Sequence, residues 1–281
     1  MSSTAPAAPG DVTVIHPGGS SLAARMAEMV RHRELLWFFV WRDLKVRYRH
    51  TLLGAAWALL QPATAALIFT IVFGRWARID SHGLPHAVFF FAGLLPWTYF
   101  AGAISAAANS VVQGERLMAR VYFPRMILPL SAVIGGLPDF LIGCTVLPLL
   151  FVYFTIAPNS TILLAPLFLL LGMVSVLGAG LWLAAVNAMF RDVRHALPFV
   201  LQVWLFVSPV AYPTTLVPTH WQWLYGLNPL AGAIEGFRWS LTGAGQSAPE
   251  LLLASAIAAV ALLVSGQAVF TKLEGELADI V

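Results

Sequence analysis

Long stretches without Asp, Glu, Lys or Arg constrain this chain more than any other feature of its sequence. They cover 52–73, 87–112, 161–190, 196–234 and 251–270, and a further stretch, 126–156, holds a single charge, Asp139. Each can supply the about 20 apolar residues that a spanning helix needs. Only 10% of the 281 residues are charged, against about 25% in soluble domains. Because lipid forces a spanning backbone into a helix or a closed barrel, we expect an all-α membrane protein.

The stretch 196–234 is too long for one helix and carries Pro209, Pro213, Pro218 and Pro229. We divide it into a fifth span that ends near Tyr212 and a short run at 221–233. Apolar runs of about 10 to 14 residues are more often re-entrant or interfacial than spanning. The sequence therefore predicts six transmembrane helices, with short re-entrant helices before the last one.

The distribution of basic residues predicts the orientation. Six spans place both chain ends on one side of the membrane. All but three of the sixteen Lys and Arg residues lie beside the spans on that side, the exceptions being Arg75, Arg78 and Arg238. Since Lys and Arg accumulate in cytoplasmic loops, we expect both termini to be cytoplasmic in a multi-pass protein of the inner membrane.

We divide the chain into a flexible cytosolic tail at 1–21, an amphipathic helix at 22–50, a six-span domain at 51–272 and a cytosolic C-terminus at 273–281. In the second part, apolar residues recur at intervals of three, four or seven among charged ones: Leu22, Met26, Met29, Leu36, Val40 and Leu44. This spacing is typical of an amphipathic helix with a basic face. Taken alone, it favours an anchor among lipid headgroups over a contact with a partner protein.

The residue types of known catalytic sites do not converge in this sequence. The histidines lie in the tail or near span ends, and H-E-x-x-H, Cys–His and G-x-S-x-G patterns are absent. The two lysines, Lys45 and Lys272, do not follow glycine, so there is no P-loop. We expect no catalytic residue, metal or cofactor in this chain, and any ATP dependence must come from another subunit. The basic clusters beside apolar stretches favour a membrane surface over nucleic acid.

Asp139 is the one charge inside a predicted span. A mid-span charge costs about 2.5 to 3.5 kcal/mol on insertion scales and often marks function. With no second carboxylate or base nearby in sequence, we favour a structural role, in which Asp139 is protonated or hydrogen-bonded at a helix interface.

Four segments, in order and with spans between them, together resemble the permeases of type 2 ABC exporters. The similarity is to those that export polysaccharides and polyol phosphates, such as O-antigen, capsule and teichoic acid. The segments are ELLWFFVWRDLKVRYRHTLLGAAWALLQP (34–62), RVYFPRMILPLS (120–131), MFRDVRHALPFVLQVWLFVSPVAYP (189–213) and NPLAGAIEGFRWSLTG (228–243). The resemblance covers residues 30–272 and implies a homodimer bound to two ATP-binding-cassette ATPase subunits, with a lipid-linked glycan as cargo.

The resemblance also implies two sets of site residues. An N-terminal interface helix would use Trp41, Arg42, Asp43, Lys45, Arg47, Tyr48 and Arg49. Cytoplasmic segments that couple to the ATPase would use Glu115, Arg116, Leu117, Met118, Arg120, Val121, Tyr122, Phe123 and Arg125, together with Arg191, Asp192 and Arg194. Within 113–125, the spacing of Leu117, Met118 and Val121 predicts a short amphipathic helix that Pro124 ends.

The chain is rich in aromatic residues, which could stack on the C–H faces of sugars along a channel. The candidates are Trp57, Trp97, Tyr99, Phe100, Trp182 and Trp204. Aromatic residues also gather at the membrane interfaces of any polytopic protein.

The function that these observations favour is export of a lipid-linked polysaccharide from the cytoplasm across the inner membrane, by a transport subunit rather than an enzyme. One alternative is a drug or lipid exporter of the same architecture. Another is a membrane-embedded transferase, against which the lack of paired acids and of a nucleotide-sugar motif argues.

Overall fold

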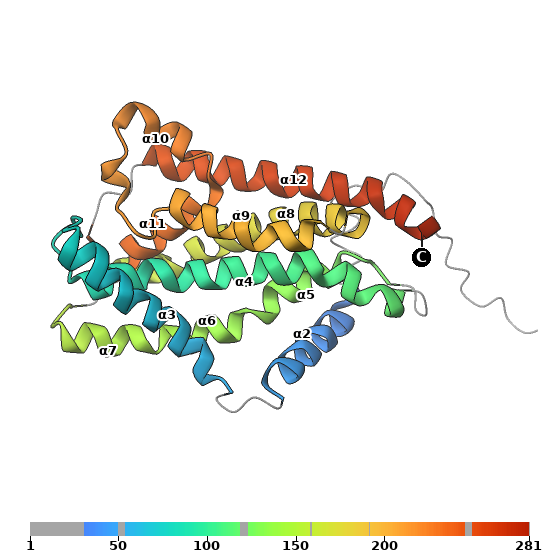
Figure 1. Ribbon diagram of the computed structural model, residues 1–281, viewed down its shortest axis with the longest axis horizontal. Coiled ribbons are helices and arrows are strands. Elements are labelled where there is room, and N and C mark those ends of the chain that lie inside the picture. The colour runs from blue at the N-terminus through green and yellow to red at the C-terminus, as the bar shows by residue number, and fades with distance from the viewer. Residues whose placement is uncertain are drawn as a thin grey trace, which may run out of the picture.

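The computed structural model describes residues 31–49, 54–118, 123–157, 159–190, 192–244 and 249–280, with side chains through Leu273. These residues form an all-helical bundle without a strand, as expected (Figure 1). Its longer helices are α2 (Arg33–Tyr48), α3 (Ala56–Phe69), α4 (His86–Met118), α8 (Ala165–Met189), α9 (Val193–Val207), α11 (Pro229–Thr242) and α12 (Pro249–Ile280). Shorter elements are the π-helix η1 (Thr70–Trp76), α5 (Ile127–Gly135), α6 (Leu137–Cys144), α7 (Val146–Tyr153), η2 (Ser160–Leu164), η3 (Thr214–Leu216) and α10 (Thr219–Tyr225).

Within the described ranges, five helical segments are long and apolar enough to cross a membrane: Ala56–Trp76, His86–Met118, Ile127–Tyr153, Ser160–Met189 and Pro249–Leu273. They correspond to the first four predicted spans and the last one. The fifth predicted span appears as α9, whose 15 residues extend about 22 Å at 1.5 Å per residue, less than the about 30 Å of bilayer hydrocarbon. The protein is a multi-pass membrane protein, and the count of six spans stays a prediction.

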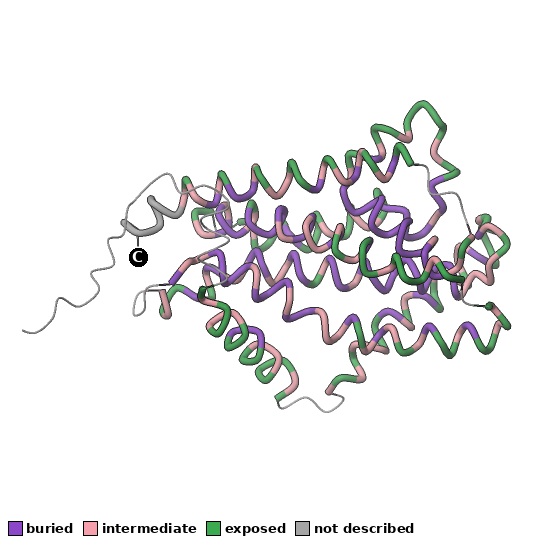
Figure 2. Tube along the Cα trace, turned by 180° about the vertical axis from the view of Figure 1, so that it is seen from behind, coloured by how far each residue is buried: buried purple, intermediate pink, exposed green. Residues whose placement is uncertain are grey.

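Helix α4 lies at the centre of the bundle. Most of its apolar window is buried, whereas α3 is buried over little of its length (Figure 2). Small residues allow this central position, because a β-carbon on Gly180 of α8 would lie 2.6 Å from that of Ala107. Small residues at helix interfaces let backbones approach closely in a membrane, where no hydrophobic effect drives helices together.

The third span is a chain of three short helices rather than one straight helix. Pro138 and Pro148 lack an N–H, and their rings press on the carbonyls four residues earlier, Ile134 and Cys144. The helices accordingly end at Gly135 and Cys144, and the next amide groups, those of Gly136 and Thr145, bond three residues back. The first junction lies beside the intramembrane charge Asp139.

The predicted short run at 221–233 is a helical hairpin, α10 and α11, in which α11 continues beyond the predicted end. Asn228 caps α11, its side chain accepting a hydrogen bond from the Leu230 amide at 3.2 Å, and Pro229 follows at the first helical position. Gly243 ends the helix at φ +66°. Both arms lie at the end of the bundle where α9 finishes and α12 starts (Figure 1). A re-entrant path through the membrane stays a prediction.

The two ends of the bundle differ in charge. We call one the basic end: it holds α2, the end of α4, the α8–α9 connection and the C-terminus of the chain (Figure 1). Exposed basic residues gather there, among them Arg33, Arg42, Lys45, Arg116 and Arg194. The opposite hairpin end carries exposed Arg75 and Arg78. Arg238, counted above among the basic residues of that side, is instead fully buried in α11.

Candidate functional site

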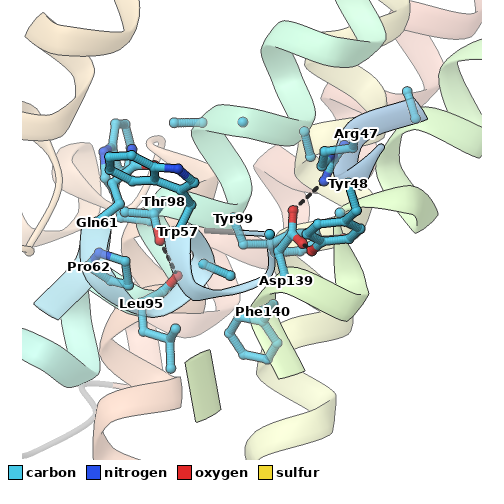
Figure 3. Close-up of a pocket in the computed structure, with 18 residues that line it drawn as sticks. Arg47, Tyr48, Trp57, Gln61, Pro62, Leu95, Thr98, Tyr99, Asp139 and Phe140 are labelled. Carbon is cyan, nitrogen blue, oxygen red and sulfur yellow. Dashed lines mark hydrogen bonds and ion pairs between the residues drawn. The ribbon is translucent and has the colours of Figure 1, made fainter. Parts of the chain in front are cut away.

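A cavity of about 440 Å³ opens between the end of α2, the start of α3, the middle of α4 and the α5–α6 junction (Figure 3). Its lining combines aromatic rings with polar side chains. The aromatic members are Tyr48, Trp57, Trp97, Tyr99 and Phe140, and the polar ones include Arg47, Gln61, Thr98 and Asp139. Ligand pockets typically combine apolar and aromatic walls with a few convergent polar groups, and this cavity meets that description.

Asp139 occupies the polar side of this cavity and is held by two side chains from the end of α2. The Arg47 guanidinium and the Tyr48 hydroxyl both donate to its carboxylate, and Arg47 also donates to the Gly135 carbonyl at 3.4 Å. The predicted structural role for Asp139 fits this arrangement, although its partners are side chains of α2 rather than freed backbone groups. Because the pair is partly solvent-accessible, it serves better as a tether than as a large source of stability.

The six aromatic candidates for a channel separate into two groups. Trp57, Trp97 and Tyr99 line the cavity, and the Tyr99 hydroxyl donates to the Val133 carbonyl at 3.0 Å. Phe100 is fully buried in the core, where its ring lies against Gly172. Trp182 and Trp204 lie elsewhere, donating to Ser265 and Asn228 respectively. The structure therefore brings together three of the six, and their role as channel residues stays a prediction.

The predicted coupling segment 113–125 begins as the last part of α4 rather than as a separate helix. Glu115 and Arg116 are exposed there. Leu117, Met118 and Phe123 pack instead against Phe39 of α2, whose ring centroid lies 5.5 Å from that of Phe123.

These three residues therefore have contacts within the chain, and their role in coupling to a partner stays a prediction. The remaining coupling residues divide as follows. Arg120, Val121, Tyr122 and Arg191 lie outside the described residues, Arg125 is partly buried, and Asp192 and Arg194 are exposed where α9 begins.

The predicted interface helix is found as α2, and the parts of it at 22–30 and at 50 lie outside the described residues, as does the tail. Its buried face, Phe39 and Val40, packs on α5. Its open face carries aromatic as well as basic groups: Trp37, Phe38, Trp41, Arg42 and Lys45. Arg42 is bonded to Asp43 at 2.7 Å, and Arg49 is exposed. Arg47 and Tyr48 turn inward to Asp139, so two predicted interface residues belong to the cavity.

Sequence reasoning missed Gln61, Pro62, Thr98 and Gly102 as cavity residues. One signal was present: a Gln-Pro pair inside an apolar span is unusual, because proline weakens the helix and the amide needs a partner. Across the part of the chain that the structure describes, no three His, Cys, Asp or Glu side chains come together as a metal site.

A bundle of apolar spanning helices around a mixed aromatic and polar cavity defines a helical membrane transport subunit. The chain matches the family model described as "ABC-2 type transporter" over residues 34–242, and it belongs to that family. Members of this family are permease subunits, which work with an ATPase subunit.

Several curated proteins are similar along most of their length. The O-antigen export system permease protein RfbA of Myxococcus xanthus is 29% identical, over 90% of this chain and 97% of that protein. The polysialic acid transport protein KpsM of Escherichia coli is 26% identical, over 69% and 76%. The inner membrane transport permease YadH of Escherichia coli K12 is 31% identical, over 66% and 75%.

Proposed function

We propose that this chain is the permease subunit of an ATP-driven exporter that moves a lipid-linked polysaccharide from the cytoplasm across the inner membrane. The observation that carries the proposal is the similarity to an O-antigen export permease along 97% of that protein. The cavity supports it, since Trp57, Trp97 and Tyr99 offer ring faces for sugar C–H groups, while Gln61 and Thr98 offer hydrogen-bonding groups.

The proposed assembly is a homodimer with two ATPase subunits, which bind ATP and Mg²⁺, at the basic end. Apolar side chains of α3 and η1 are exposed in one copy and would face lipid or the second copy: Trp57, Leu60, Leu67, Ile68 and, in η1, Ile71. We place the basic end in the cytoplasm because Lys and Arg concentrate there. In this arrangement α9 with the extended residues that follow it forms the fifth span, and α10 and α11 enter the membrane from the outside and return.

The function is tested by removing the chain from its native host and restoring it. Loss should abolish surface polysaccharide and leave lipid-linked polysaccharide in the cytoplasm. Restoration should need both this chain and a partner ATPase with an intact P-loop lysine. Normal surface polysaccharide in the deletion strain, with altered drug resistance or altered membrane lipids, would instead identify the drug or lipid exporter. Sugar transfer by the purified chain without any ATPase would identify the transferase.

The orientation gives a first prediction. Reporter tags at both termini and after Arg116 should report cytoplasm, and a tag at His82 should report the outside, because the basic residues stay on the cytoplasmic side. Cysteines placed at Asn228 and Trp239 should be accessible to a label added outside and not to one added on the cytoplasmic side. A periplasmic N-terminus contradicts the orientation, and labelling of Asn228 and Trp239 from opposite sides would make the hairpin a true span.

The basic end gives a second prediction. Arg116→Glu should weaken binding of the ATPase at least about tenfold, the size expected for reversing one charge at an interface, and export should fall with it. Arg116 is exposed at the end of α4, so the protein should stay folded. Leu117→Asp is a poorer probe, because Leu117 packs in the cluster around Phe39. Co-purification of the ATPase with the permease measures the effect.

The matched control is Arg75→Glu, the same charge reversal at an exposed position of the hairpin end. It should bind the ATPase as the wild type does. If Arg116→Glu retains full ATPase binding and export, the coupling contact lies elsewhere, and Asp192 and Arg194 become the next residues to change.

A further inference from the structure

Helix α9 ends abruptly at Val207, and proline is the reason. Pro209 has no N–H and disfavours the helical region for the residue before it. Ser208 accordingly takes an extended conformation, with φ −102° and ψ 153°. We call residues 208–212 the elbow. The last carbonyls of α9 and those of the elbow lose their helical partners, and in an apolar environment each needs another donor.

Side chains supply those donors, and most of them come from the α10–α11 hairpin. The Asn228 amide donates to the Val207 carbonyl at 3.3 Å and to the Ser208 hydroxyl at 3.0 Å. Arg238 donates to the Pro209 carbonyl at 2.5 Å, with the Val210 carbonyl at 3.5 Å. The elbow itself adds the Tyr212 hydroxyl, which donates to the Phe206 carbonyl at 3.0 Å, so the end of α9 is capped by the hairpin and the elbow together.

Both terminal nitrogens of Arg238 have hydrogen-bond partners. The side chain is fully buried, and its guanidinium donates to the Glu235 carboxylate at 2.9 Å, one turn earlier on α11. The guanidinium carbon lies 4.0 Å from the centre of the Phe89 ring of α4. Gly93 of α4 leaves room for it, since a β-carbon there would be 2.4 Å from the Arg238 Nη2 atom. One side chain therefore joins α11, α4 and the elbow.

Glu235 extends the same cluster to the first connection of the hairpin end. The Thr214 side chain of η3 hydrogen-bonds to the Glu235 carboxylate, and His82 of the α3–α4 connection interacts with it electrostatically. The His82 imidazole is also 3.5 Å from the Thr215 hydroxyl. Two connections that are far apart in the sequence, α3–α4 and α9–α10, consequently come together around one buried ion pair.

A buried ion pair is weak evidence for stability, because apolar residues of similar volume often replace such pairs at no cost. An arginine with carbonyl acceptors on a separate segment does something that an apolar residue cannot: it fixes where that segment lies. We propose that Arg238 is a positioning residue that fastens the elbow of α9 to α11 and α4, so that α9 and the hairpin move as one body during transport.

This inference rests on the proposed function, because only in a transporter would the link between α9 and the hairpin transmit movement. Helix α9 starts at the basic end, where exposed Asp192 and Arg194 lie, and finishes at the hairpin end. A displacement of α9 at the ATPase side is then passed to the outer hairpin through the Arg238 bonds.

Three variants test the link in the whole transporter with its ATPase, reconstituted in lipid nanodiscs. Arg238→Lys keeps the charge and loses the branched donor geometry. Gly93→Ala keeps Arg238 and displaces its guanidinium from the α4 side. Glu235→Leu combined with Arg238→Met removes both charges and fills the space, which should restore folding stability without restoring donors to the elbow. Ser240→Ala is the control, since the buried Ser240 hydroxyl donates to the Phe237 carbonyl of α11 itself.

The first measurement is the labelling of a cysteine at Ala211→Cys, a buried elbow position, in a Cys144→Ala background. In all three variants this cysteine should react with the label at least about tenfold faster than it does in the otherwise wild-type protein. That factor is expected when a hydrogen bond to a charged group is lost. The control should label as wild type does. The second measurement is function: the variants should bind the ATPase and hydrolyse ATP while export is lost, and the double variant should keep the wild-type unfolding temperature.

The proposal is overturned if the double variant exports at the wild-type rate, because the pair would then serve stability alone. It is equally overturned if the elbow cysteine labels at the wild-type rate in all three variants. A wild-type transporter that exports no polysaccharide would refute the proposed function. The link between α9 and the hairpin would still be tested, because the cysteine labelling needs no substrate.

Discussion

Gly178→Val is expected to prevent this permease from reaching a stable folded state. A β-carbon on Gly178 of α8 would lie 2.6 Å from the backbone nitrogen of Leu263 and 2.7 Å from the carbonyl carbon of Leu262, both on α12. Gly266 faces it, since a β-carbon there would lie 2.4 Å from the Gly178 oxygen. Two backbones touch here, so neither side can yield by turning a rotamer.

Overpacking of a core typically costs about 1 to 3 kcal/mol when side chains can adjust, and we expect a larger loss where α8 and α12 must separate. Protein level, size-exclusion profile and the unfolding temperature in detergent measure it. The control is Gly135→Ala, because a β-carbon on Gly135 meets no atom within 4 Å. A Gly178→Val protein with the wild-type unfolding temperature would show that α8 and α12 are not packed as described.

The second large effect concerns the cavity. Gly102 of α4 lines it, and a β-carbon there meets no atom within 4 Å. Gly102→Phe should therefore fold normally and place its ring in the space between Trp57, Trp97 and Asp139. If this space is on the path of the glycan, export should fall by more than the about tenfold that small changes of fit in a pocket can cause. Surface polysaccharide and protein level, measured together, separate obstruction from misfolding.

Gly102→Ala supplies the matched comparison. One methyl group occupies little of the 440 Å³ cavity, so this variant should retain most of the export activity. A graded loss from alanine to leucine to phenylalanine would follow the volume added. Normal export by Gly102→Phe at a normal protein level would remove the cavity from the export path and leave Trp57 and Trp97 as interfacial aromatics.

The sequence predicted the helical membrane class and the approximate place of each long helix, because apolar length and charge are local properties that lipid acts on directly. A structural role for Asp139 could be predicted, since an isolated acid with no second carboxylate or base nearby in sequence is poorly suited to proton transfer. Its partners could not, because Arg47 and Tyr48 lie more than 90 positions away in the chain.

Other features depend on tertiary contacts and so left little trace in the sequence. Arg238 was counted as a flanking positive charge, and only the fold shows that Glu235, Phe89 and two elbow carbonyls surround it. Leu117 and Met118 were predicted to meet a partner, and only the fold shows that they also pack in the cluster around Phe39 of α2. Among the aromatics, Phe100 and Trp57 both lie in long stretches without charged residues, yet Phe100 is in the core and Trp57 lines a cavity.

The burial of α4 against helices that follow it has a consequence for biosynthesis. Chains are made and inserted from the N-terminus, so α4 must reside in lipid before α8, α11 and α12 exist. Its long apolar sequence lets α4 remain in lipid during that time, since a stable single helix needs no neighbour in the bilayer. Arg238 has no such freedom, because a charge in hydrocarbon is costly until it is paired. By the time the ribosome reaches it, Phe89 and Gly93 of α4 and the elbow carbonyls have already been synthesised. The order of synthesis thus delivers the receiving site before the charge, and a permuted chain in which α11 preceded α4 should be held by the insertion machinery or degraded.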